Sequence, residues 1–241
     1  MESKGKLFLI PVSLGSENAA MISEFNKEII SGIEVFIVEN AKSARHFLRS
    51  AGFEKKFDDV LFFEIDKHET DFDFSEFIKP ATEGKNIGLL SEAGSPGVAD
   101  PGAEIVSLAH QKRIRVVPLT GSSSILLALM ACGFNGQQFA FHGYLPIEKN
   151  ERSTKIRELE KESRQKNQTQ LFIETPYRNN SLLESLLQNC GASTRLCIAA
   201  NLTLPDEKII SQTISEWKKS KQDFNKQPAV FVLYCGNPTQ K

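Results

Sequence analysis

The sequence predicts an α/β protein of two domains, and three observations carry this prediction. The first half contains five short apolar runs, at residues 7–12, 33–38, 60–65, 87–91 and 115–119. Helix-forming stretches separate several of these runs, and this alternation is typical of a parallel sheet with helices packed on both faces. The chain has 241 residues, which fits one large domain or two of roughly 120 residues each.

The helices of the first half are expected between these strands. Residues 41–51 form one candidate, with Gly52 as its stop, and residues 104–111 form another. A shorter helix begins at Ser75 and is expected to end at Pro80, because proline removes a backbone donor and clashes with the preceding turn.

The second half is less regular. Its elements are listed here in order: helix 124–132, strand 139–144, helix 150–167, strand 171–174, helix 180–188, strand 195–201, strand 208–211, helix 214–219 and strand 229–234. We therefore expect an N-terminal domain at residues 1–118, a junction at 119–122 and a C-terminal domain at 123–241.

Composition and charge exclude several classes of protein. Apolar residues make up 40% of the chain, charged residues 24%, and 29 basic against 30 acidic residues leave a net charge of −1. These values exclude a disordered chain, a collagen-like fibre and a disulfide mini-protein. They offer no overall attraction for nucleic acid, so such contact requires a local basic patch. Two basic stretches qualify, residues 42–56 and 149–166, and the second is diluted by glutamates and equally fits a solvated helix face.

The four cysteines predict neither a metal site nor a redox motif. Cys132, Cys190, Cys197 and Cys235 contain no C-x-x-C pair and have apolar or small neighbours, so we expect buried, reduced thiols. Neither a signal peptide nor a run of about 20 apolar residues is present, which favours a cytoplasmic protein.

The most distinctive segment is the loop at residues 91–102, Ser-Glu-Ala-Gly-Ser-Pro-Gly-Val-Ala-Asp-Pro-Gly. It leaves a predicted parallel strand at the carboxyl end, where open α/β sheets bind ligands. Its glycines allow close backbone approach and its prolines restrict movement. The alternative is a long surface loop without a site.

A second loop, residues 118–124, places hydroxyl and backbone N–H groups at the start of a helix, which suits a ligand rich in acceptors or a plain helix cap. It lacks the lysine of a P-loop, and no G-x-G-x-x-G follows a strand, which disfavours a dinucleotide site. Among other polar residues, His142 is more typical of a structural histidine, and Glu174 and Arg178 could simply pair with each other.

Together these segments resemble the tetrapyrrole methylase superfamily, the class III S-adenosylmethionine-dependent methyltransferases. The likeness is carried by Ile10-Pro11, the 91–102 loop, Val-Pro-Leu-Thr-Gly-Ser at 117–122, Gly-Tyr-Leu-Pro at 143–146 and Glu-Thr-Pro-Tyr-Arg at 174–178. It spans residues 7–233 and is greatest to the small-subunit ribosomal RNA 2′-O-ribose (cytidine) methyltransferases.

The resemblance implies a second domain with a mixed sheet, a cleft between the domains that holds S-adenosylmethionine, and a homodimer. It implies no metal and no membrane contact. The positions that match the donor site are Pro11, Glu92, Gly94, Val98, Ser122, Ser123, Tyr144, Leu145, Ala200, Asn201, Pro228 and Ala229.

The substrate side departs from the ribosomal RNA branch. That branch has Thr-Pro-Ile-Gly-Asn-Leu-Gly-Asp where this chain reads Ile-Pro-Val-Ser-Leu-Gly-Ser-Glu at 10–17, and an Asp at the position of Glu92. Its Glu-Asp-Thr-Arg after the second strand is here Glu-Asn-Ala-Lys at 39–42, and its Arg-Glu-Leu-Thr-Lys is Ala-Asn-Leu-Thr-Leu at 200–204.

The leading hypothesis is therefore methyl transfer to a ribose hydroxyl of ribosomal RNA. Glu39 is the candidate general base, because it ends a parallel strand on the ligand side, although capping of the next helix is an alternative role. His68 and Glu69 are weaker candidates. Lys42, Arg45 and Arg178 are the candidate phosphate contacts.

Two other hypotheses remain open. One is a methylase acting on carbon of a tetrapyrrole or on another small molecule. The other is a donor-binding or RNA-binding protein that retains the fold without catalysis.

Overall fold

The structure is a computed structural model, and it describes residues 4–15, 21–65 and 73–236. Its contacts divide the chain into two compact units, Met1–Ser123 and Ser124–Lys241, and each is described separately. His68 and Glu69 lie outside the described residues.

The first unit is built on a five-stranded parallel sheet, as the sequence predicts. Its strands are β1 (Lys6–Ile10), β2 (Val35–Val38), β3 (Leu61–Glu64), β4 (Ile87–Leu90) and β5 (Arg115–Pro118). They lie in the order β3-β2-β4-β1-β5, and every neighbouring pair is parallel. The helices are α1 (Glu24–Ser31), α2 (Ala41–Ser50), α3 (Ser75–Thr82) and α4 (Gly102–Gln111).

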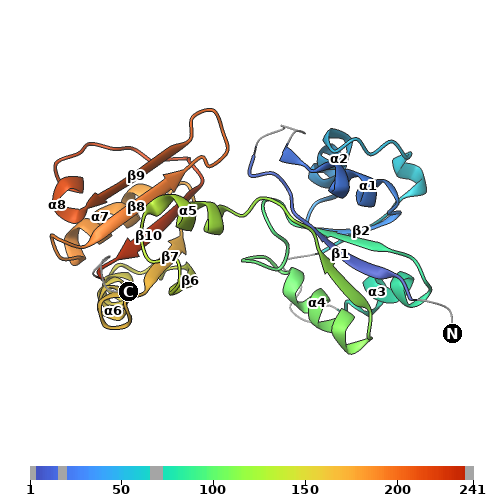
Figure 1. The fold of residues 1–241 in the computed structure, drawn as a ribbon, viewed down its shortest axis with the longest axis horizontal. Coiled ribbons are helices and arrows are strands. Elements are labelled where there is room, and N and C mark those ends of the chain that lie inside the picture. The colour runs from blue at the N-terminus through green and yellow to red at the C-terminus, as the bar shows by residue number, and fades with distance from the viewer. Residues whose placement is uncertain (1–3, 16–20, 66–72, 237–241) are drawn as a thin grey trace. The chain divides into compact units, whose positions relative to one another are not determined.

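These helices cover both faces of the sheet (Figure 1). Apolar residues of α1 and α2, such as Ile30 and Phe47, pack with Phe8 and Phe36 of the strands on one face. Residues of α3 and α4, such as Phe77 and Ile105, pack with Leu7 and other strand residues on the opposite face. The alternation of strand side chains between the two cores fixes the register, because a slip of one residue would exchange them.

Two elements of the first unit differ from the sequence predictions. Helix α1 was not predicted, although Ser23 caps it by accepting a hydrogen bond from the Asn26 N–H. Helix α3 does not end at Pro80 but continues to Thr82. Burial of Phe77, Ile78 and Ala81 against the sheet offsets the one hydrogen bond that the proline cannot donate.

The second unit has a mixed five-stranded sheet. Its strands are β6 (Phe139–Tyr144), β7 (Thr169–Ile173), β8 (Arg195–Ala200), β9 (Lys208–Thr213) and β10 (Ala229–Tyr234), in the order β6-β7-β10-β8-β9. Strands β6 and β7 are parallel, and the other neighbouring pairs are antiparallel. The helices are α5 (Ser124–Cys132), α6 (Lys149–Lys166), α7 (Asn179–Asn189) and α8 (Ile214–Trp217).

The core of the second unit joins α6, α7 and α8 to the sheet. Trp217 is buried, and its indole N–H donates to the Leu196 carbonyl at 2.9 Å. All four cysteines are free, as expected, and burial raises the pKa of Cys190 and of Cys197 to about 12. Cys235 is only half-buried and accepts hydrogen bonds from Arg164, so the prediction of four buried thiols is wrong at this position.

Candidate active site

In the first unit, strand order places the candidate site at the carboxyl ends of β1 and β4. The chain leaves β1 toward β2 on one side and leaves β4 toward β5 on the other. Such a divergence between neighbouring parallel strands is the switch point where open α/β sheets bind ligands. The two loops meet there in a backbone bridge. The Val12 N–H donates to the Gly94 carbonyl at 2.8 Å, and the Gly94 N–H donates to the Val12 carbonyl at 2.9 Å.

The loop after β4 is also held by its own short side chains. The Ser91 hydroxyl donates to the Gly94 carbonyl at 2.9 Å, and the Ser95 hydroxyl donates to the Ser122 carbonyl at 3.1 Å. One carboxylate oxygen of Asp100 accepts hydrogen bonds from the backbone N–H groups of Gly97 and Gly102. The segment predicted from its small residues is thus an internally braced loop.

Glycine is required at two positions of this edge. Gly94 has a φ of +76°, which side chains rarely tolerate, and a Cβ there would lie 3.4 Å from Leu14 Cδ2. A Cβ on Gly121 would lie only 2.4 Å from Pro11 Cβ. The loops after β1 and β5 can approach this closely only because Gly121 has no side chain.

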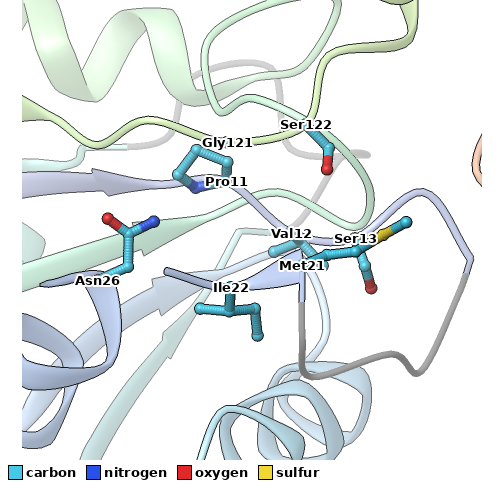
Figure 2. A pocket seen from close by; sticks show the side chains of 8 residues that line it. All are labelled: Pro11, Val12, Ser13, Met21, Ile22, Asn26, Gly121 and Ser122. Carbon is cyan, nitrogen blue, oxygen red and sulfur yellow. The ribbon is translucent and has the colours of Figure 1, made fainter. Parts of the chain in front are cut away.

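A pocket lies beside this contact (Figure 2). It is lined by Pro11, Val12, Ser13, Met21, Ile22, Asn26, Gly121 and Ser122, and Figure 2 shows Pro11 next to Gly121 with Asn26 and Ile22 below them in the view. Its empty volume is about 250 Å³, part of it open to solvent. Small-molecule sites measure roughly 300–1,000 Å³, so a nucleoside-sized ligand would extend beyond it.

Asn26 is a site residue that the sequence analysis missed. It is 3% exposed, and its amide donates to the Thr120 carbonyl at 2.8 Å, which ties α1 to the loop after β5. Its Oδ1 is buried and has no hydrogen-bond partner among the described residues. The signal was a polar residue within the apolar spacing of Ile22, Ile29 and Ile30 on one helix face.

Glu39 follows β2 at the same edge and is half-buried. Its Oε1 accepts a hydrogen bond from the Glu92 N–H at 3.1 Å, so the β4 loop orients the candidate base. The Glu92 carboxylate accepts instead from the Ser43 hydroxyl at 2.7 Å. The cap of α2 is Asn40, whose Oδ1 accepts from the N–H groups of Lys42 and Ser43. Capping is therefore not the role of Glu39.

The candidate phosphate contacts of this unit lie on α2. Lys42 and Arg45 are exposed and one turn apart, so they share a helix face. The Arg45 guanidinium lies 5.0 Å from the ring centre of Phe62, and the Arg49 guanidinium lies 4.1 Å from that of Phe57. These aromatic faces hold two arginines along the helix without neutralising their charge.

In the second unit, the predicted residues also share one sheet edge. Strands β6, β7 and β8 point in one direction, since β7 and β8 are both antiparallel to β10. Their carboxyl ends therefore lie at one edge together with the start of β10. Ala200 pairs with Ala229, and the Asn201 N–H donates to the Pro228 carbonyl at 2.9 Å. Tyr144 and Leu145, at the end of β6, reach the same edge.

Arg178 stands in the turn that follows β7. Its Nε and Nη2 donate to Glu174 Oε1 at 3.0 and 2.6 Å. The hydrogen bond from Glu174 raises the pKa of Arg178 further, so its positive charge is permanent. The pairing weighed from the sequence is confirmed. His142 is likewise engaged structurally, with Nε2 2.6 Å from Gln170 Oε1.

The structure thus gathers most predicted site residues at two edges, one in each unit. Pro11, Glu39, Glu92, Gly94 and Ser122 are joined by direct contacts at the first. Val98 lies farther along its loop and is 49% exposed, and Ser123 is the last residue of the first unit. Within the described ranges, no group of three or more His, Cys, Asp or Glu could hold a metal ion. No helix of those residues is long and apolar enough to cross a membrane.

Comparison with known proteins decides the family. The family model for tetrapyrrole (corrin/porphyrin) methylases matches residues 9–218. The chain belongs to this family. Its fold also matches the uroporphyrin-III-C-methyltransferase of Thermus thermophilus, with a TM-score of 0.57 at 18% identity over 96% of this chain and 94% of that one. For the methyltransferase CobJ the TM-score is 0.63 at 14% identity, over 95% and 94% of the two chains.

Among curated relatives, this family member is similar to proteins named ribosomal RNA small subunit methyltransferase I. It is 27% identical to the one from Escherichia coli O157:H7, over 96% of this chain and 78% of the relative. It is 29% identical to that of Bacillus subtilis, over 88% of this chain and 68% of the relative. The resemblance found from the sequence motifs is confirmed.

Proposed function

We propose that this protein transfers a methyl group from S-adenosylmethionine to a ribose 2′-hydroxyl of small-subunit ribosomal RNA. The observation that carries the proposal is the similarity to ribosomal RNA small subunit methyltransferase I over nearly the whole chain. The preserved loop after β4, with its backbone bridge to Val12, supports the methyl-donor part of the proposal. The exposed cations of α2 support the RNA part.

The residues at the first sheet edge fit the donor. S-adenosylmethionine supplies an electrophilic methyl group on a sulfonium, together with amine and hydroxyl groups that need hydrogen-bond partners. The loops here are small, and the buried Asn26 Oδ1 is an acceptor without a partner among the described residues. We propose that Pro11, Gly94 and Ser122 bind the donor in the first unit, with Glu92, Val98 and Ser123 completing the set.

The corresponding set in the second unit is Tyr144, Leu145, Ala200, Asn201, Pro228 and Ala229. Leu145, Ala200, Asn201 and Ala229 are buried, so their backbone groups rather than their side chains would serve the ligand. A site built from backbone groups tolerates sequence change as long as the residues stay small. This is consistent with relatives of only 26–29% identity.

Glu39 would act as the general base. A ribose hydroxyl is a weak nucleophile, and a carboxylate that accepts its proton strengthens it. The Glu92 N–H fixes Glu39 Oε1 in place. Lys42, Arg45 and Arg178 would bind RNA phosphates, since each is a cation with donors directed away from the core. The family resemblance further proposes a cytoplasmic homodimer, which light scattering of the purified protein would test.

The proposal is tested by nucleoside analysis of small-subunit ribosomal RNA from cells with and without this protein. Loss of one 2′-O-methylated nucleoside in the cells without it is the expected result. Identical nucleosides in both samples would exclude ribosomal RNA as the acceptor. In that case, binding of S-adenosylmethionine measured by calorimetry would separate a methylase of a small molecule from a protein that binds no donor.

A further inference from the structure

The turn after β7 combines three features that the donor site does not use. Residues 174–178, Glu-Thr-Pro-Tyr-Arg, connect β7 to α7 and are closed by a hydrogen bond from the Arg178 N–H to the Thr175 carbonyl at 2.9 Å. The turn carries a buried carboxylate, an arginine bound to it and a highly exposed tyrosine. Each feature has a physical consequence for what the turn can bind.

The carboxylate of Glu174 fixes the arginine. The Glu174 side chain is fully buried, and its Oε1 accepts hydrogen bonds from the Thr175 N–H and from Nε and Nη2 of Arg178. A buried carboxylate holds a guanidinium in one orientation through these paired contacts. The Arg178 side chain remains 36% exposed, and its Nη1 has no hydrogen-bond partner among the described residues. Two N–H donors of a positioned cation are thus available to an anion.

Tyr177 places an aromatic ring next to this cation. It is 75% exposed, and Tyr144, at the end of the neighbouring strand β6, is 59% exposed. Of the three tyrosines in the chain, only Tyr234 is buried. The ring of Tyr177 is amphipathic and has no neighbouring ring, so both of its faces can accept a flat partner. A phosphate contact next to an open ring is the arrangement by which proteins bind unpaired nucleotides.

We propose that the turn at residues 174–178 binds one unpaired nucleotide of the RNA substrate. Arg178 contacts its phosphate, Tyr177 stacks on its base, and Glu174 is a positioning residue that acts through Arg178. This inference rests on the proposed function, because it assigns a local structure to that RNA. An unpaired nucleotide is favoured over a duplex, since the bases of a helix are stacked on each other and present no face to Tyr177.

Stacking is tested with single-stranded RNA of about 12 nucleotides that carries 2-aminopurine, whose fluorescence falls when it stacks. The wild-type protein should quench the probe, and the same sequence in a duplex should bind more weakly. Tyr177→Ala should lose the quenching and about tenfold in affinity, whereas Tyr177→Phe should retain both. Phe25→Ala is the matched control, because Phe25 is an exposed ring of the first unit (64% exposed). Equal quenching by wild type and Tyr177→Ala would overturn the stacking role.

The positioning role of Glu174 predicts a result of unusual sign. Glu174→Gln removes a negative charge, so a purely electrostatic effect would strengthen RNA binding. Positioning through Arg178 predicts weaker binding by several fold and a shallower salt dependence, by roughly 0.7 for the one phosphate lost from a single strand. In an Arg178→Ala background, Glu174→Gln should have no further effect. Additive losses, or tighter binding by Glu174→Gln alone, would overturn this role.

Two measurements separate these failures from others. Thermal unfolding of each variant identifies loss of fold, and Tyr177→Phe and Tyr177→Ala test the stacking role even where Glu174→Gln is unstable. If the wild-type protein binds neither the RNA probe nor S-adenosylmethionine, the proposed function itself fails. If the wild type binds and methylates RNA but the Tyr177 and Glu174 variants do the same, only this inference fails.

Discussion

The two sheet edges that carry the candidate site are built in different ways. At the first edge, backbone groups form the main contacts: Val12 bridges Gly94, and Ser95 reaches the Ser122 carbonyl. At the second edge, the prominent contact is ionic, between Glu174 and Arg178. The first edge depends on residues being small, whereas the second depends on the chemical identity of particular side chains.

This difference separates two tasks within one protein. Backbone donors and acceptors are the same in every residue, so an edge made from them keeps its ligand while the sequence changes. Side chains such as Arg178, Tyr177 and those of Lys42 and Arg45 on α2 can change with the methyl acceptor. We infer that the first edge binds the donor shared across the family and that the exposed side chains select the acceptor. The predictions below are ordered by the size of the expected effect.

The largest effect is expected from Glu39→Gln. Loss of a general base typically lowers the chemical step by 10²- to 10⁴-fold, while the neutral amide keeps the shape and can still accept from the Glu92 N–H. Single-turnover methylation of the small ribosomal subunit measures the rate, and calorimetry should show unchanged donor binding. Glu64→Gln is the matched control, because Glu64 is a carboxylate at the end of β3 that accepts from the Ala41 N–H. An unchanged rate would leave positioning alone as the source of catalysis.

Gly94→Arg should weaken donor binding by about 100-fold or more. The substitution strains a φ of +76° and fills the space beside Leu14 and Ser122. Gly52→Arg provides the control, since Gly52 also has a positive φ, of +84°, but nothing lies within 4 Å of its Cβ position. The strain is therefore similar and only the site differs. Calorimetry with S-adenosylmethionine decides the outcome, and equal affinity of the two folded variants would remove Gly94 from the donor site.

Replacing Lys42, Arg45 and Arg178 together with alanine should weaken RNA binding about tenfold and flatten its salt dependence, with donor affinity unchanged. The matched control replaces Lys155, Arg157 and Lys161 on α6, where Lys155 lies 3.9 Å from Glu158 and Arg157 bonds Asn189. If the α6 variant loses RNA binding instead, the second basic stretch is the RNA contact. Thermal unfolding accompanies the assay, because loss of Arg178 leaves the buried Glu174 without its cation.

A smaller effect is expected from Asn40→Ala. Asn40 caps α2 through the N–H groups of Lys42 and Ser43, and loss of such a cap costs about 1 kcal/mol of stability. Urea unfolding followed by circular dichroism should show this decrease. The rate of methylation at saturating donor should change far less than in Glu39→Gln. A rate loss as large as that of Glu39→Gln would mean that the geometry of the helix start, rather than the carboxylate, controls the reaction.

The sequence was sufficient for the sheet of the first unit and for the loop after β4. Buried parallel strands are nearly continuous apolar runs, and a loop of Gly, Pro and Ser next to one of them is distinctive. Helix α1 was missed because Asn26 interrupts its apolar spacing, and that interruption is the buried residue that ties α1 to Thr120. The position of Pro80 within α3 was also missed, because tertiary packing of Phe77 and Ala81 outweighs local preference. The long-range contacts, from Glu92 to Glu39 and from Gly121 to Pro11, depend on strand order, which local patterns do not encode.

The central claim is that this chain methylates a ribose hydroxyl of small-subunit ribosomal RNA. The most direct test incubates the purified protein with S-adenosylmethionine carrying a labelled methyl group and small ribosomal subunits from cells that lack the protein. The RNA is then digested to nucleosides. The account predicts one labelled 2′-O-methylated nucleoside with the wild-type protein and a strongly reduced yield with Glu39→Gln. Label on a base, or no label in RNA although the protein binds the donor, would contradict it.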